Sequence, residues 1–162
     1  STEVRPTTGQ LREALFNICQ LYVEGARFLD LFAGSGAMGL EALSRGAAHA
    51  TFVDNHRPAL QAIRHNIASL KVEKETTVLT IDVFKALKLL AEQEATFEII
   101  YADPPYGKTL SAPVLEFIDK SSLLTQGGLL FIEDSSLNPP PLEHLHLKNE
   151  RRAGRAILSC FQ

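Results

Sequence analysis

Asp103-Pro104-Pro105-Tyr106 combines an acid, two prolines and an aromatic ring directly after an apolar stretch, residues 97–102, that indicates a strand. Because prolines fix φ and lack a backbone N–H, the loop is expected to be rigid, with carbonyls free to accept hydrogen bonds. A carboxylate and such a carbonyl can hold an amino group, while Tyr106 offers a flat face to the ring that carries it. The tetrapeptide predicts a site for a planar amine, and the alternative is a turn that merely ends a strand.

A second chemical feature is the segment Asp30 to Gly39, DLFAGSGAMG, which follows an earlier strand pattern and contains the spacing G-x-G-x-x-G. Glycines let the backbone approach a ligand closely, and the following helix points its first N–H groups into the crevice. Asp54 lies twenty residues after Gly34, where a dinucleotide fold places a ribose-binding carboxylate, and Asp82 follows the third predicted strand. The segment indicates a nucleotide-like cofactor. Its alternatives are a tight turn for the loop and helix N-caps or solvated acids for the two aspartates.

Two cofactors compete for this loop. NAD brings a pyrophosphate, which Asp30 would repel, whereas S-adenosylmethionine brings a sulfonium and an ammonium group, which nearby acids attract. A dehydrogenase would also need an acid or base such as histidine at the sheet edge, and none of the five histidines stands in a strand-end motif. S-adenosylmethionine is therefore the expected cofactor.

Apolar strand patterns alternate with helical ones along the chain, after an amphipathic first helix that we expect to end at Gly25. Such alternation predicts an α/β fold with a parallel sheet covered on both faces. Strands are expected at residues 27–32, 49–53, 77–81, 97–102 and 128–132, and helices at 37–44, 58–70, 83–92 and 112–120. Residues 145–148 and 156–161 are expected to form a terminal antiparallel pair, joined by the charged segment 149–155.

Composition bounds the class of protein. The 162 residues, 45% of them hydrophobic and 22% charged, suit a single domain, 1–162, with a helical segment at 1–24 and a core at 25–162. Cys19 and Cys160 match no metal spacing, and no apolar segment predicts a membrane span or secretion signal, so a cytoplasmic protein without a metal is expected. No segment suggests a dimerisation stripe, and a monomer is expected. With a net charge of −3, any nucleic acid would have to be bound by local basic patches.

Several motifs taken together carry a family resemblance. They are Arg5-Pro6-Thr7, the pairs Arg12-Glu13 and Phe16-Asn17, the segment from Asp30 to Ala47, and Asp103 to Tyr106. In combination they resemble the RsmD family, the bacterial small-subunit (16S) ribosomal RNA guanine-N2 methyltransferases. This chain has Tyr106 where the family often has phenylalanine, and Asp54 where glutamate is frequent.

The resemblance implies a Rossmann-like class I S-adenosylmethionine-dependent methyltransferase, with a mostly parallel seven-stranded sheet and a terminal antiparallel hairpin. It implies that Phe32 to Gly36 line the cofactor pocket, that Asp54 binds the ribose and that Asp82 with Val83 meets adenine. The expected cofactor-binding residues are Asp30, Phe32, Ala33, Gly34, Ser35, Gly36, Asp54, Asn55, Asp82, Val83 and Asp103. The expected catalytic residues are Asp103, Pro104, Pro105 and Tyr106, and the expected RNA-binding residues are Arg5, Thr7, Arg12 and Lys108.

The expected reaction is an in-line displacement in which the exocyclic N2 of a guanine in small-subunit ribosomal RNA attacks the sulfonium methyl group and S-adenosylhomocysteine leaves. A base reaching this loop must be unpaired or flipped out. In the tail, Lys148, Arg151, Arg152 and Arg155 are either further RNA contacts or solvated surface. One alternative is a DNA adenine-N6 methyltransferase, although the chain shows no separate target-recognition domain. Another is a non-catalytic S-adenosylmethionine-binding or ribosome-assembly module.

Overall fold

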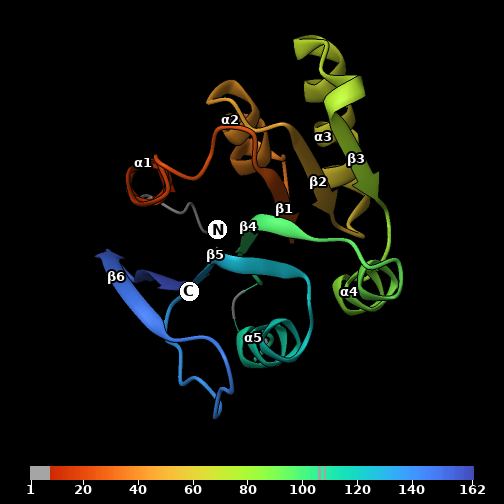
Figure 1. The fold of residues 1–162 in the computed structure, drawn as a ribbon. Coiled ribbons are helices and arrows are strands. Elements are labelled where there is room, and N and C mark those ends of the chain that lie inside the picture. The colour runs from red at the N-terminus through yellow and green to blue at the C-terminus, as the bar shows by residue number, and fades with distance from the viewer. Residues whose placement is uncertain (1–7, 106, 108) are drawn as a thin grey trace.

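The computed structural model describes residues 8–105, 107 and 109–162. Four residues with predicted roles, Arg5, Thr7, Tyr106 and Lys108, lie outside them. The helices are α1 (Thr8–Ile18), α2 (Ala37–Ser44), α3 (Arg57–Leu70), α4 (Val83–Glu92) and α5 (Ser111–Lys120), with a short 3-10 turn at Glu73–Glu75 (Figure 1). The strands are β1 (Arg27–Leu31), β2 (His49–Val53), β3 (Thr76–Leu79), β4 (Phe97–Ala102), β5 (Leu124–Asp134), β6 (Leu147–Ala153) and β7 (Ala156–Phe161). None of these helices is long and apolar enough to cross a membrane.

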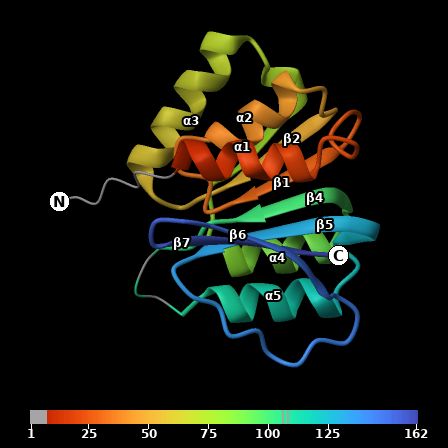
Figure 2. The same ribbon diagram turned by 90° about the vertical axis from the view of Figure 1, so that its left-hand side faces the viewer.

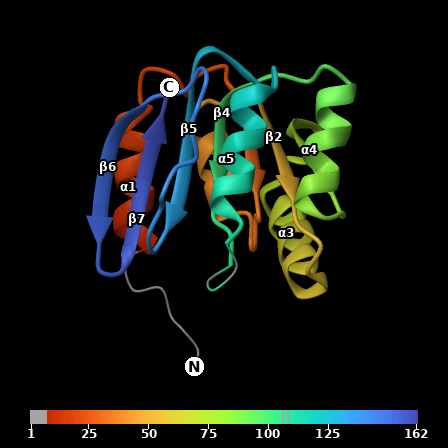
Figure 3. The same cartoon turned by 90° about the horizontal axis from the view of Figure 1, so that it is seen from below.

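All seven strands form one sheet in the order β3-β2-β1-β4-β5-β7-β6. Pairing is parallel from β3 to β5, whereas β7 runs antiparallel to both β5 and β6. The arrowheads of β2, β5 and β6 consequently point to the same edge and that of β7 to the opposite one (Figure 3). This arrangement confirms the predicted α/β fold with its mostly parallel seven-stranded sheet and terminal hairpin.

Helices cover both faces of the sheet, α1, α2 and α3 on one and α4 and α5 on the other (Figure 2). The central strands alternate between the two sides, as the two-residue period of a strand requires. Phe28, Ile99 and Phe131 pack in the core with α1 and α2. Their chain neighbours Leu29, Ile100 and Leu130 pack in the core with α4 and α5. Burial on both faces is why these strands are nearly continuous apolar runs.

Several predicted boundaries are wrong. Helix α1 ends at Ile18 instead of Gly25, and strand β5 is longer than expected, beginning at Leu124 and ending at Asp134. The charged segment 149–155 was expected to connect two strands, yet most of it belongs to β6 and only a two-residue turn, Gly154-Arg155, follows. An edge strand pairs on one side only and its side chains face solvent, so it tolerates the charges that argued against a strand.

Cys19 and Cys160 are both buried and unbridged in the core beneath α1. Burial raises the pKa of Cys19 to about 12 and that of Cys160 to about 11. Both therefore behave as small buried hydrophobic residues.

Candidate active site

The carboxyl ends of β1 and β4 meet at the centre of the sheet. From β1 the chain proceeds outward through β2 and β3, and it then returns to β4 on the other side of β1. Open α/β sheets bind ligands at such a switch point. The glycine loop follows β1 and the Asp103 loop follows β4, and the Asp103 N–H lies 3.4 Å from the Leu31 carbonyl. The two segments that predicted chemistry are thus adjacent.

The glycine loop has an unusual backbone. Phe32 has φ of +57°, a left-handed conformation that is uncommon for a bulky residue. Gly34 and Gly36 also have positive φ, and Gly36 is the N-cap of α2. The Ala33 N–H donates to the Val53 carbonyl at 3.0 Å, which ties the loop to β2. Strain of this kind is concentrated at ligand sites, because surrounding contacts must hold it in place.

Helix α2 packs tightly against β2 through Gly39. A Cβ atom at this position would lie 2.4 Å from the Phe52 ring, closer than packing allows. The Gly39 N–H also donates to Asp30 Oδ2 at 3.0 Å. Gly39 therefore fixes the start of α2, and with it the glycine loop, against the sheet.

Asp30 lies beneath the glycine loop and is 1% exposed. Within the described part of the chain, its Oδ1 is the buried side-chain polar atom without a hydrogen-bond partner. Burial raises the pKa of Asp30 well above its usual range, the Gly39 N–H opposes the shift, and the charges of Asp103 and Asp54 add to it. Three acids are thus close enough to affect one another. Because the raised pKa favours a neutral Asp30, the charges of Asp54 and Asp103 are the ones that suit a cationic ligand and oppose a pyrophosphate.

Asp54 and Asp82 occupy different positions relative to this loop. Asp54 is half-buried and accepts hydrogen bonds at 2.9 Å from the N–H groups of Gly34 and His56, so it joins the glycine loop to the end of β2. The N-cap of α3 is His56, which corrects the alternative that Asp54 caps this helix. Asp82 is exposed and does cap its helix, α4, by accepting from the N–H groups of Phe84 and Lys85. Both carboxylates keep further acceptor positions for a ligand.

The Asp103 loop, which holds the expected catalytic residues, begins at a half-buried Asp103, continues through a buried Pro104 and reaches an exposed Pro105. Below it, the buried Tyr101 hydroxyl donates to Glu133 Oε1 at 2.6 Å. Burial, together with the charges of Asp103 and Glu133, raises the pKa of Tyr101 well above its usual range, so the hydroxyl remains a donor. This cross-strand bond fixes the end of β4 against β5 directly beneath the loop.

Sequence reasoning missed Tyr101 and Glu133, and it also missed Ser111 and Asp134 in the neighbouring loops. The signal for Glu133 was an acid continuing the apolar run 129–132, because a charge in a buried strand needs a partner. The sequence around Ser111 and Asp134 gave no comparable indication that these residues are paired. Their hydrogen bond joins residues 23 positions apart and depends on the tertiary fold.

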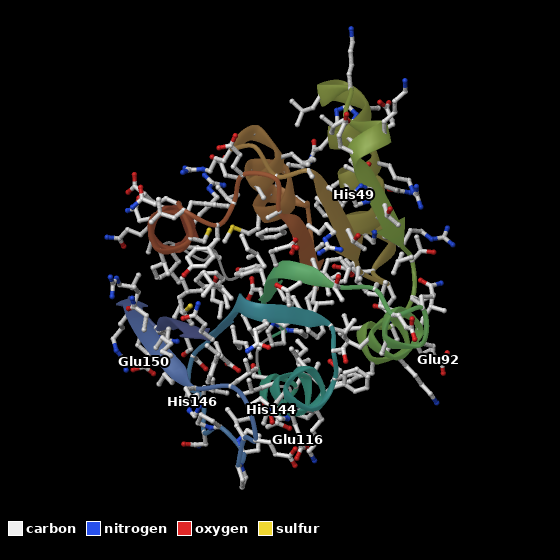
Figure 4. All side chains as sticks on the ribbon, in the orientation of Figure 1. His49, Glu92, Glu116, His144, His146 and Glu150 are labelled. Carbon is white, nitrogen blue, oxygen red and sulfur yellow. The ribbon has the colours of Figure 1, made fainter. Side chains whose placement is uncertain are left out.

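Histidines are distributed away from the switch point, with one exception. His49 lies far from His144 and His146 (Figure 4), and each of the three is at or before the start of a strand, at the opposite edge of the sheet. His65 lies within α3 and is exposed. His56 follows β2 and is exposed. Among the residues that the structure describes, no group of three histidine, cysteine, aspartate or glutamate side chains could hold a metal ion.

Of the predicted RNA-binding residues, only Arg12 is described. It is half-buried and borders a hollow of about 290 Å³ between α1 and α2, together with Gln10, Glu13 and Arg45. This hollow includes no described residue of the Asp103 loop, and the role of Arg12 stays a prediction.

Similarity to known proteins identifies the family. The family model described as Conserved hypothetical protein 95 matches residues 1–162. Ribosomal RNA small subunit methyltransferase D of Escherichia coli (strain K12) is 34% identical over 164 residues, which cover 100% of this chain and 81% of that protein. The chain belongs to the RsmD family.

Solved structures agree with the RsmD assignment. The Escherichia coli protein yhhF has a TM-score of 0.86 at 33% identity, covering 98% of this chain and 87% of that one. A second protein, SMU.776, was solved in complex with SAH and has a TM-score of 0.80 over 98% of this chain and 50% of its own. At 15% identity this second likeness concerns the fold alone. The roles of individual RsmD site residues in this chain stay predictions.

Proposed function

We propose that this chain transfers a methyl group from S-adenosylmethionine to the exocyclic N2 of a guanine in small-subunit ribosomal RNA. The observation that carries the proposal is the adjacency of the Asp103 loop and the glycine loop at the β1/β4 switch point. One loop suits an amine, and the other suits a nucleotide-like cofactor. Membership in the RsmD family supports ribosomal RNA as the substrate. A cytoplasmic monomer is part of the same proposal.

The residues at the switch point fit S-adenosylmethionine. When bound, it supplies a methyl group already activated by the sulfonium. Asp54 and Asp103 give this edge of the sheet the negative charge that the sulfonium and ammonium favour, whereas the buried Asp30, whose pKa is raised, supports the loop from below. Asp54 is held at the end of β2 and keeps acceptor positions for a ribose hydroxyl. The glycine loop supplies close backbone approach.

Asp103 and the Pro104 carbonyl would act on the acceptor. An exocyclic amine is a weak nucleophile because its lone pair is delocalised into the ring. Two acceptors directed at its N–H groups would hold the amine with that lone pair aimed at the methyl carbon and would stabilise positive charge as it develops. Collinear positioning can contribute several of the roughly 7–11 kcal/mol available to well-oriented reactions. The proton then leaves to Asp103 or to water.

Asp103→Ala tests this function. We expect methyl transfer to fall by about 100-fold or more, because the variant loses an acceptor that stabilises the transition state. Binding of S-adenosylmethionine, measured by calorimetry, should persist and fall by a smaller factor than methyl transfer, because Asp54 and the glycine loop remain in place. Transfer is measured with labelled S-adenosylmethionine on small subunits and on free RNA, followed by nucleoside identification by mass spectrometry.

Glu92→Gln is the matched control, because this exposed acid ends α4, which starts after the carboxyl end of β3 and leads back to the start of β4, at the opposite edge of the sheet from Asp103. Its activity should equal that of the wild type. Labelled N2-methylguanosine from the wild type supports the proposal. Methyladenine in DNA, or a biological effect that survives Asp103→Ala, would contradict it.

A further inference from the structure

A polar pocket of about 320 Å³ lies between the loops that follow β4 and β5. In the strand order β1-β4-β5, this places it on the side of the Asp103 loop away from the glycine loop. Its volume is in the range of small-molecule sites. Residues that line it include Gly107, Thr109, Ser111, Asp134, Ser135 and Asn138.

The register of strands β4 and β5 places Asp134 beside the Asp103 loop. β4 and β5 pair in parallel with Ala102 opposite Ile132, so Pro104 and Asp134 each lie two residues beyond the same pair. The two positions are neighbours at the carboxyl edge of the sheet. A group held by Asp103 and Pro104 would therefore have Asp134 close to it.

The Asp134 carboxylate is fixed in place but retains acceptor capacity. Ser111, only 3% exposed, donates its hydroxyl to Asp134 Oδ2, and the Ser135 N–H donates to Oδ1 at 2.7 Å. An ionised carboxylate offers about four acceptor positions, so a further donor can bind. Asp134 is half-buried and lines the pocket, which leaves it accessible to a ligand.

The charge of the lining selects the kind of ligand. The described residues of the lining include Asp134 and neither a lysine nor an arginine. A phosphate would be repelled by that carboxylate, whereas a base edge with N–H donors would be held. Enzymes that modify a flipped base read its Watson–Crick edge in such a pocket.

We propose that this pocket receives the Watson–Crick edge of the target guanine, that Asp134 accepts its N1–H, and that Ser111 positions Asp134. This inference rests on the proposed function. In guanine, N1–H is next to the carbon that carries N2, so one base can meet Asp134 while its amine meets Asp103 and Pro104. Adenine presents an acceptor at N1 and would face the carboxylate unfavourably. Asp134 would thus explain why the site selects guanine over adenine.

The test compares guanine with 2-aminopurine at the methylated position, once mass spectrometry has located it, in reconstituted small subunits. 2-Aminopurine keeps the amine but has an acceptor at N1. In Asp134→Asn, we expect kcat/KM for guanine to fall by about 10- to 100-fold, because the group that accepts N1–H loses its charge and one of its two acceptor oxygens. The asparagine amide can donate to N1 of 2-aminopurine, so the ratio of kcat/KM for guanine to kcat/KM for 2-aminopurine should decrease, or fall below one. Ser111→Ala should shift this preference in the same direction by a smaller factor.

Glu92→Gln removes the same charge at the opposite edge and should match the wild type on both substrates. Cofactor binding should be unchanged in Asp134→Asn, and unfolding should remain a single cooperative transition. The inference is overturned if Asp134→Asn keeps the wild-type preference, or if it lowers KM for both substrates, as a phosphate site would. A wild type that methylates no RNA would instead overturn the proposed function itself.

Discussion

Asp30 shows how one residue can be recognised in the sequence and still act in an unexpected way. Its position before the glycine loop suggested direct attraction of the cationic end of the cofactor. The structure places the carboxyl under the loop, 1% exposed, with one oxygen accepting from Gly39. Contact with a ligand stays a prediction, and what the structure describes is support of the loop from below.

Asp30→Asn should change how stability depends on pH. Burial raises the pKa of Asp30 in the folded protein above its unfolded value near 4, so folding takes up a proton. The wild type therefore loses stability as pH rises above about 4 and continues to lose it until the folded pKa is reached. Asparagine keeps an acceptor for the Gly39 N–H and carries no charge.

Urea unfolding of both proteins between pH 4 and pH 8 checks this expectation. The free energy of unfolding of Asp30→Asn, relative to that of the wild type, should increase with pH. Parallel pH profiles would show that Asp30 titrates normally in the folded state.

At the scale of elements, the packing of α2 against β2 determines the conformation of the glycine loop. The helix begins at the glycine loop, and Gly39 allows its backbone to approach the Phe52 ring on β2. In the sequence, Gly39 stands out only as the last glycine of a motif. Its packing role follows from the position of a side chain thirteen residues later in the chain.

Gly39→Ala should destabilise the protein by about 1–3 kcal/mol, because the new Cβ would lie 2.4 Å from Phe52 in a filled core. The forced shift of α2 should also weaken S-adenosylmethionine binding. Denaturant unfolding and calorimetry measure the two effects.

Gly9→Ala is the matched control, since Gly9 is also helical and an added Cβ would meet no atom of the described residues within 4 Å. There the higher helix propensity of alanine should leave stability equal or raise it by up to about 1 kcal/mol. Equal effects at both positions would show that the contact with Phe52 is unimportant.

Across the whole molecule, a net charge of −3 coexists with a basic edge near the candidate site. β6 runs in the same direction as β5, so Arg151, Arg152 and the turn residue Arg155 lie at the edge that holds the Asp103 loop (Figure 3). All three are exposed. In the described part of the chain, Arg27 and Arg45 pair with carboxylates, whereas Arg152 and Arg155 do not. Such cations are available to RNA phosphates.

Arg152→Ala combined with Arg155→Ala should weaken RNA binding and reduce the slope of log K against log salt by about 1.5, if each contacts one phosphate. Cofactor affinity should not change. Binding titrations at several salt concentrations measure the slope.

The pair Lys74→Ala and Lys88→Ala removes the same charge from exposed positions before β3 and on α4. This control should leave the slope unchanged. If the two double variants lose equal affinity, the effect comes from net charge and the hairpin is no RNA surface.

Local patterns in the sequence were enough to predict most helices and strands, the fold class, the glycine loop and the loop that begins at Asp103. Helical and strand periods, glycines and prolines act over a few residues, and the order of strands and helices restricts the topology. The same patterns failed at β6, where charges on an exposed edge masked a strand, and at the end of α1.

Tertiary structure alone decided how the site residues meet. The register between β4 and β5 brings Tyr101 to Glu133 and places Asp134 beside Pro104, and the placement of β1 between β2 and β4 brings Gly34 to Asp54. These contacts join positions 20 to 32 residues apart. They depend on strand pairing and on core packing summed over the whole sheet, which no short stretch of sequence encodes. The sequence by itself therefore determined a nucleotide loop and an amine loop, and the fold decided that they lie side by side at the β1/β4 switch point, with Asp30 buried beneath the glycine loop.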